Sequence, residues 1–236
     1  MTKTNSTQFS NFFRAVSYYD KALKGASLCL WIKTGSCCDP ENKEGLSHLL
    51  EHVLFGTKKR LLRSDIYLSV IDRQLRIKAF TKAEHTAFII ESVDKLNLQR
   101  CIDFLWEIFS GKLLSNQALV EAKLDISQEI DDLSADPVKS LFEALNFICF
   151  PNQFHGRSIT GTKETINNIK IDDLVNFQRQ HYSPNNSLIC VCGNIEHQQL
   201  LDSLEPKFSE LSENNKSFLP LSHWVGGVKK IKSVDK

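Results

Sequence analysis

Residues 44–56 read EGLSHLLEHVLFG, and this stretch predicts an amphipathic helix over about residues 44–55. Apolar side chains recur three and four positions apart, which is the spacing that places them on one face of an α-helix. These side chains are Leu46, Leu49, Leu50, Val53 and Leu54. Because such a face is stable only when it is buried against another layer, we expect the helix to pack on a sheet or on other helices.

The same helix carries His48, Glu51 and His52 in the order H-L-L-E-H. Residues i and i+4 lie on one helix face about one turn apart, a separation at which two imidazoles can bind a single zinc ion. Glu51 projects near this face and could take a proton from a water molecule at such a site. The alternative is that these are ordinary helix residues, but polar side chains among buried leucines cost free energy unless they have partners. The pattern therefore favours a metal site.

A third ligand has to come from another part of the chain, because a catalytic zinc typically has three protein ligands and one open position. Glu129, in the stretch KLDISQEIDDL, is the best candidate. On composition alone, Glu129 would be interpreted as a solvated carboxylate on a helix.

The segments around this helix predict strands, then several helices, then a strand and a helix at the end of the chain. The strands are predicted at residues 11–19, 25–34, 75–82, 85–92 and 187–194, and the helices at 63–73, 95–110, 116–134, after Pro137, 171–181 and 196–209. This order predicts an α+β fold, with a mostly antiparallel sheet of about five to six strands and helices layered on one face.

Composition excludes several classes of protein. The 236 residues are 42% hydrophobic and 24% charged, as in ordinary soluble domains. A net charge of +1 argues against electrostatic binding of nucleic acid. No apolar run approaches the roughly 20 residues of a membrane span, and the beginning, MTKTNSTQFSN, lacks the apolar core of a secretory signal. We therefore expect neither a nucleic acid nor a membrane as partner.

Seven cysteines, an odd number, leave at least one thiol that cannot pair within the chain. The adjacent Cys37 and Cys38 are poorly placed for an unstrained disulfide. Cys190 and Cys192 alternate on a predicted strand, where small buried thiols fit well. The cysteines therefore indicate a reducing compartment, most simply the cytoplasm.

Together these features resemble the pitrilysin/insulinase family of zinc metallopeptidases, which carry H-x-x-E-H followed by a distal glutamate. The resemblance is nearest to the branch that contains mitochondrial processing peptidase and its bacterial relatives. It extends over most of the chain, through the stretches ENKEGLSHLLEHVLFGTKKR (41–60), AFTKAEHTAFII (79–90) and GRSITGTKETINNIKIDDLVNFQRQHYSPNNSLICVCGNI (156–195).

The resemblance implies that His48, His52 and Glu129 bind one Zn²⁺ and that Glu51 is the general base that activates water. The implied reaction is hydrolysis of short or unfolded peptides. A second implication concerns residues 79–81 (Ala79, Phe80 and Thr81), which resemble the edge strand to which family members add an extended substrate by backbone pairing. For this segment, an ordinary internal strand is the alternative.

Family peptidases typically have two such domains per subunit. We therefore expect residues 1–220 to form a single metallopeptidase-like domain and residues 221–236 to be a linker or tail leading to a missing second half. A homologous peptidase-like subunit or a homodimer mate would then complete the enzyme.

Two positions depart from the family pattern. The family usually has Gly-Gly and then Asn before the edge strand, whereas residues 75–78 here read LRIK and place Lys78 at the asparagine. The family also has a glutamate seven residues before the distal ligand, where this chain has Ala122, with Glu121 one step away and about 100° round the helix. These departures weigh toward a second hypothesis, a non-catalytic partner or scaffold subunit of a peptidase complex.

A purely structural zinc is a third possibility, and it would need a closed site with four ligands. No fourth ligand is evident in the sequence. The remaining candidates are better explained as loop, strand or helix residues; they are His85, His155, His181, His197 and Tyr182.

Overall fold

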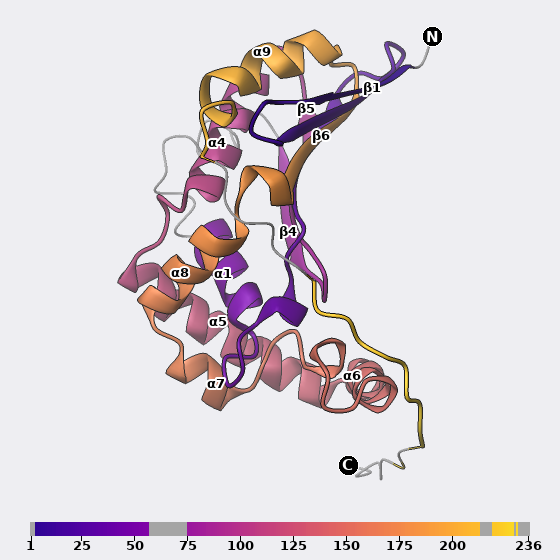
Figure 1. The fold of residues 1–236 in the computed structure, drawn as a ribbon, viewed down its shortest axis with the longest axis vertical. Coiled ribbons are helices and arrows are strands. Elements are labelled where there is room, and N and C mark those ends of the chain that lie inside the picture. The colour runs from indigo at the N-terminus through magenta and orange to yellow at the C-terminus, as the bar shows by residue number, and fades with distance from the viewer. Residues whose placement is uncertain (1–2, 57–74, 213–218, 229, 231–236) are drawn as a thin grey trace.

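A computed structural model describes residues 3–56, 75–212, 219–228 and 230 of the chain. It has one open six-stranded sheet in the order β1-β2-β6-β3-β5-β4, whose helices lie on one face (Figure 1). The strands are β1 (Lys3–Gln8), β2 (Arg14–Tyr19), β3 (Ala26–Ile32), β4 (Arg76–Thr81), β5 (Thr86–Val93) and β6 (Ser187–Gly193). Neighbouring strands are antiparallel except for β2 and β6, which are parallel. The predicted α+β class is confirmed.

The α-helices of the described residues follow the predicted order. They are α1 (Leu46–Phe55), α4 (Leu98–Ser110), α5 (Asn116–Ala135), α6 (Pro137–Cys149), α7 (Lys163–Asn168), α8 (Ile171–His181) and α9 (His197–Phe208). In Figure 1, α9, α4, α1 and α8 follow the sheet from one end to the other, and α5, α6 and α7 lie at its lower end. The helix predicted at 63–73 lies outside the described residues.

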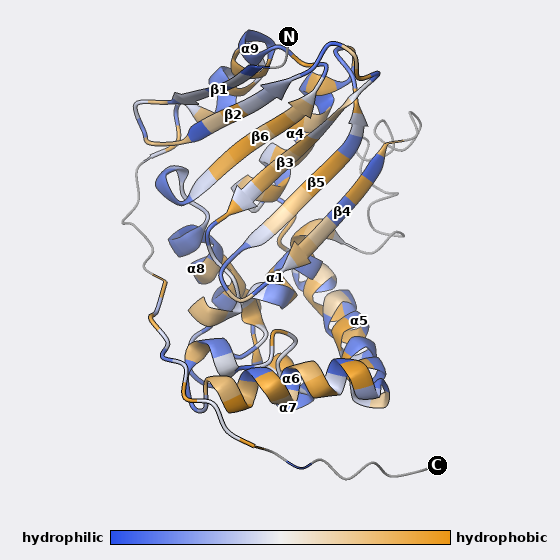
Figure 2. Cartoon of the chain, turned by 90° about the vertical axis from the view of Figure 1, so that its right-hand side faces the viewer, coloured by the Kyte–Doolittle hydropathy of each residue, from blue (hydrophilic) through white to orange (hydrophobic). Residues whose placement is uncertain are grey.

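The core lies between the sheet and the helices packed on it, chiefly α1, α4 and α9. The central strands β6, β3 and β5 carry most of the apolar residues of the sheet, whereas β1 is polar (Figure 2). Alternate residues of β3 turn toward the helices and are buried: Ala26, Leu28, Leu30 and Ile32. Most of α1 is also buried, because it packs between the sheet and α5. This burial fixes the position of the H-L-L-E-H stretch.

Some elements differ from the sequence expectation. The strand predicted at 11–19 begins only at Arg14, because residues 9–13 form a turn in which Phe12 has a left-handed φ of 68°. β1 was not predicted, since its sequence KTNSTQ has no apolar alternation and it joins the sheet as an edge strand through backbone pairing with β2. The short helix α7 was not predicted either.

The segment after residue 218 is hydrogen-bonded to the end of α6. Gln153 exchanges two hydrogen bonds with the backbone of His223, at 2.9 and 2.7 Å, and the Val225 amide donates to the Cys149 carbonyl. His155 Nδ1 lies 2.7 Å from Ser222 Oγ. This part of the predicted tail therefore follows a defined path along the domain.

Two further findings bear on the sequence analysis. All seven cysteines are free thiols. Among the described residues, no helix is both long enough and apolar enough to cross a membrane.

His181, the last residue of α8, gives the fold a testable dependence on pH. Its side chain is buried, and burial lowers its pKa to about 4. The unfolded residue titrates near 6.5, so between these values the unfolded state takes up the proton and stability falls as pH falls. We expect acidification from pH 7 to pH 5 to remove up to about 2 kcal/mol of unfolding free energy through this group.

Chemical denaturation at the two pH values tests this for the wild type and for His181→Gln. The variant should show a shallower loss of stability on acidification. His223→Gln, at an exposed position in the C-terminal segment, is the matched control and should behave like the wild type. Equal slopes for wild type and His181→Gln would contradict the assignment.

Candidate metal centre

The beginning of α1 is fixed by the buried side chain of Asp39. Its carboxylate accepts hydrogen bonds from the Gly45 and Ser47 amides, both at 2.8 Å. These donors belong to the first turn, whose N–H groups have no partner within the helix, and a carboxylate there also suits the helix dipole. Gly45 has φ 91°, and a Cβ at this residue would lie 2.6 Å from the Thr160 carbonyl oxygen, so glycine is required. The register of the candidate metal ligands on α1 follows from this cap.

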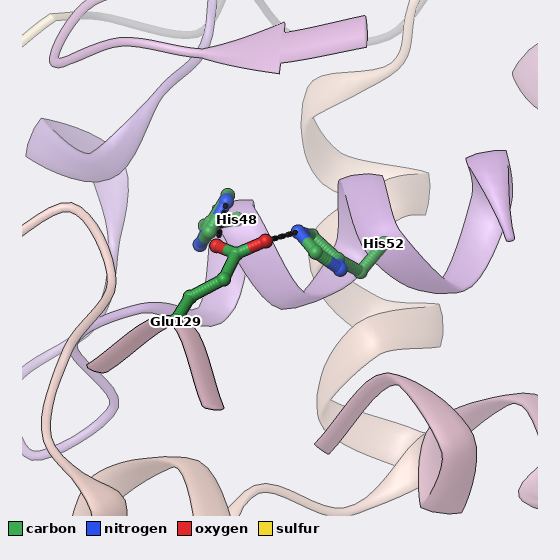
Figure 3. Close-up of side chains that lie close together, drawn as sticks. All are labelled: His48, His52 and Glu129. Carbon is green, nitrogen blue, oxygen red and sulfur yellow. Dashed lines mark ion pairs between the residues drawn. The ribbon is translucent and has the colours of Figure 1, made fainter. Parts of the chain in front are cut away.

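Two helices bring the predicted ligands together. His48 and His52 lie one turn apart on α1, and Glu129 of α5 extends its carboxylate between them (Figure 3). Glu129 Oε2 lies 3.6 Å from His48 Nε2, and Oε1 lies 3.3 Å from His52 Nε2. The three residues can each offer a ligand atom within 4.8 Å of the others. Among the described residues, no other group of His, Cys, Asp and Glu side chains meets this criterion.

The two imidazoles are held in the neutral form that a metal requires. Burial, and then the neighbouring His52, lower the pKa of His48 to about 3. Burial also lowers the pKa of His52, against an opposing effect of Glu129. Both shifts favour the neutral ring, which keeps a lone pair for coordination.

The hydrogen bonding of His48 also suits a metal. Its Nδ1 is buried without a partner in the described parts of the chain, and its Nε2 is too far from Glu129 for a good hydrogen bond. A buried imidazole that lacks hydrogen-bond partners lowers the free energy of unfolding, and a cation bound at Nε2 would offset part of that loss. The donor set of two imidazoles and one carboxylate suits Zn²⁺. The residues present therefore fit the metal that the sequence predicts.

Glu51 occupies the buried side of the same helix. It is 5% exposed, and Thr81 Oγ1 donates a 2.8 Å hydrogen bond to its Oε2. Burial raises the pKa of Glu51 to about 7; the Thr81 hydrogen bond opposes this, and the charge of Glu129 adds to it. A carboxyl group with a pKa near neutrality can both accept and release a proton, which is the property of a general base.

The predicted substrate strand lies at the edge of the sheet. Ala79, Phe80 and Thr81 belong to β4, which pairs with β5 on one side and with no other strand of the described residues. Phe80 packs edge-on against Trp31 and His85. The Thr81 side chain is hydrogen-bonded to Glu51, so a peptide added to this edge would contact the backbone of Thr81 and not its side chain.

The two departures from the family pattern have different surroundings. Lys78 forms an ion pair with Glu91 at 2.7 Å on the neighbouring strand. Ala122 is buried in the core, and Glu121 accepts a hydrogen bond from Gln117 on the exposed side of α5. Glu121 therefore does not replace the missing carboxylate beside the metal site.

Two cavities adjoin the three candidate ligands. The larger, of about 730 Å³, extends from His48 and Glu129 to α6 and residues 156–160. The smaller, of about 430 Å³, lies beside Glu51, His52 and Glu129. Both have room for part of a peptide, and the smaller one lies next to the candidate base, Glu51.

The other histidines have local partners. His85 stacks on Trp31, with ring centroids 4.2 Å apart. His155 bonds to Ser222 and also contacts Glu84 at 3.0 Å, and His197 lies within 2.9 Å of both Thr7 and Ser17. A closed structural site with four ligands is not formed by the described residues.

Sequence reasoning missed the residues that hold this site in place. Asp39 lies six residues before the N-cap Gly45, outside the spacing at which a capping residue can be recognised, so no local pattern singles it out. Thr81 was assigned to substrate binding, and its contact with Glu51 has no signal in the sequence because the two residues belong to different elements.

Comparison with known proteins agrees with this geometry. Residues 14–163 match the family model described as insulinase (peptidase family M16). The chain belongs to this family. Residues 168–235 match a second model, described as the peptidase M16 inactive domain.

Similar proteins include β subunits of mitochondrial-processing peptidase. The Neurospora crassa subunit is 26% identical over 210 residues, and the alignment covers 89% of this chain and 44% of that protein. The human subunit is 28% identical, with 87% of this chain and 42% of that protein covered. The chain therefore spans less than half the length of these relatives.

Solved structures share the fold. A protease from Helicobacter pylori superposes with a TM-score of 0.83 at 19% identity, covering 95% of this chain and 54% of that chain. The first half of the periplasmic protease PqqL from Escherichia coli gives a TM-score of 0.79 at 22% identity, covering 92% of this chain and 49% of that chain. At such low identities these similarities establish the fold alone.

Zinc binding by the predicted ligands can be measured directly. We expect one zinc per chain by elemental analysis, and stabilisation by about 2.7 kcal/mol when free zinc exceeds its Kd a hundredfold. His52→Asn should lose both the bound metal and the rise in Tm. His197→Asn, which removes a hydrogen-bonded histidine outside this site, should keep both; a zinc-induced rise in Tm that survives in His52→Asn would contradict the assignment.

The cap on α1 should matter for metal affinity as well as for stability. Asp39→Ala removes both acceptors from the first turn, so we expect a loss of about 1–2 kcal/mol of stability together with weaker zinc binding. Asp94→Ala is the matched control, because Asp94 accepts two backbone hydrogen bonds just before α4, away from the histidines. Zinc titration by calorimetry should distinguish them, and equal zinc affinities in the two variants would show that the cap does not position the site.

Proposed function

We propose that this chain is the catalytic domain of a zinc-dependent endopeptidase that hydrolyses short or unfolded peptides. Membership of the M16 peptidase family supports hydrolysis of peptides as the type of reaction. The observation that carries the proposal is the convergence of two neutral imidazoles and the Glu129 carboxylate beside the buried Glu51.

In this proposal His48, His52 and Glu129 hold the zinc ion. Bound there, zinc would supply a Lewis acid that polarises the scissile carbonyl group. Glu51 takes a proton from the attacking water and later delivers it to the leaving amine, a role for which its pKa near neutrality suits it.

The substrate is proposed to bind as an added strand on β4. Backbone pairing at residues 79–81 would hold an extended peptide with little regard to its sequence. The exposed edge of β4 and the adjoining cavities support this placement. Folded proteins would be excluded because they do not present an extended segment, which is why we propose short or unfolded peptides.

A second homologous domain is proposed as partner, either as a separate subunit or as another copy of the chain. The relatives are more than twice as long as the matched region, which supports completion by a further domain. Residues 1–220 would form the catalytic domain, and residues 221–236 would lead toward the partner. A cytoplasmic location stays a prediction, for which the seven free thiols are the support.

The decisive variant is Glu51→Gln, which removes the base and leaves the three ligands in place. We expect peptide hydrolysis by the zinc-loaded full chain to fall by about 10²–10⁴-fold, with zinc content unchanged. Glu121→Gln makes the same change on the exposed side of α5 and should keep wild-type activity. A chelator should abolish hydrolysis by the wild type, and equal hydrolysis by wild type and Glu51→Gln would exclude this mechanism.

The alternative is a non-catalytic partner or scaffold subunit of a peptidase complex. It is favoured by the match of residues 168–235 to a model described as an inactive domain and by the absence of a carboxylate at Ala122. Zinc content separates the two functions. A metal-free chain that still binds an M16 peptidase subunit would support the scaffold role.

A further inference from the structure

We propose that Thr81 is a positioning residue that fixes the orientation of the Glu51 carboxylate. The inference rests on the proposed function, in which Glu51 is the base, and it adds a residue whose side chain had been assigned to the substrate. It follows from one short hydrogen bond between the edge strand and the helix that carries the histidines.

The Glu51 carboxylate depends on Thr81 for its orientation. Within the described residues, the hydroxyl of Thr81 supplies the one hydrogen bond that this carboxylate accepts. The terminal torsion of a glutamate has no sharp preference, so a carboxylate with no donor could rotate. A donor at 2.8 Å to Oε2 selects one orientation and leaves Oε1 for the proton transfer.

Thr81 is itself held rigidly. It is 7% exposed, at the last position of β4, and a β-branched side chain has few rotamers. Its hydroxyl lies 3.4 Å from the hydroxyl of Thr86, the residue directly opposite on β5. Thr86 in turn donates to the Thr34 carbonyl at 2.9 Å. Each hydroxyl has a single proton: that of Thr86 is donated to Thr34, and that of Thr81 is directed to the nearer of its two possible acceptors, Glu51 Oε2 at 2.8 Å.

The chain of contacts continues across the neighbouring strands to the end of α8. Asn186 donates to Thr34 Oγ1 and to the His181 carbonyl, both at 2.8 Å. All of these side chains are buried. The network therefore ties the position of Thr81 to backbone outside α1, namely the segment after β3, the beginning of β5 and the end of α8.

Another hydroxyl near Glu51 does not share this role. The charge of Glu51 contributes to the raised pKa of Tyr182, but the Tyr182 hydroxyl is buried without a hydrogen-bond partner among the described residues. Thr81 is thus the residue through which the sheet orients the Glu51 carboxylate.

The test compares Thr81→Val, which keeps the shape and removes the hydroxyl, with Thr81→Ser, which keeps the hydroxyl. In the zinc-loaded full chain, with short unstructured peptides as substrates, we expect Thr81→Val to lower kcat about tenfold or more, with KM within about twofold of wild type. Thr81→Ser should restore most of kcat. Zinc content should be the same in all three proteins, because Thr81 does not contact the histidines.

Ser17→Ala is the matched control, since it removes a buried, hydrogen-bonded hydroxyl from β2 of the same sheet, outside the network that holds Thr81, and its kcat should stay near wild type. In the Glu51→Gln background, Thr81→Val should cause no further loss. The inference is overturned if Ser17→Ala matches Thr81→Val, if Thr81→Val loses zinc, or if Thr81→Val and Glu51→Gln have independent effects. A wild type without Glu51-dependent hydrolysis would instead overturn the proposed function, and this inference with it.

Discussion

The structure depends on the burial of a polar helix face. α1 lies between the sheet and α5, yet it carries two histidines and a glutamate that cannot be left without partners in such a place. Each partner comes from a different element: Glu129 of α5 faces the imidazoles, Thr81 of β4 binds Glu51, and Asp39 caps the first turn. A helix that needs three distant partners can occupy only one position, so the requirement that fixes α1 also assembles the candidate site.

The sequence predicted the parts of the molecule that are governed by local periodicity. The helix at Ile171–His181 was predicted with the observed bounds, and the strands around residues 25–34 and 85–92 were found because apolar side chains alternate there. Pro137 begins α6, as its fixed φ favours at a first helical position. In the site, the spacing of His48, Glu51 and His52 was sufficient, because their geometry is internal to one helix.

The remainder depends on contacts between elements, which local patterns do not encode. Glu129 could be named as a candidate third ligand, but only the resemblance supported it over the other carboxylates of α5, since nothing in the sequence of α5 indicates which of them faces α1. β1 pairs through its backbone and has no side-chain signature. The threonines at the ends of β4 and β5 have the composition of ordinary strand residues, and their relation to Glu51 arises only when the hairpin packs beside the helix.

Different residues of α1 meet two requirements of the candidate site, an accessible place for a cation and a buried base. The histidines face Glu129, whose side chain is 46% exposed, so a cation held between them would be reachable from solvent. Glu51 projects near the same face but is itself only 5% exposed, and this burial keeps its proton affinity high. One turn of helix thus supplies both an accessible cation site and a shielded base, because successive positions on α1 face different surroundings. This arrangement buries polar groups, which lowers the folding stability of the metal-free domain. A cation bound to the histidines would restore part of that folding stability at the site itself, where the proposed chemistry requires rigid side chains.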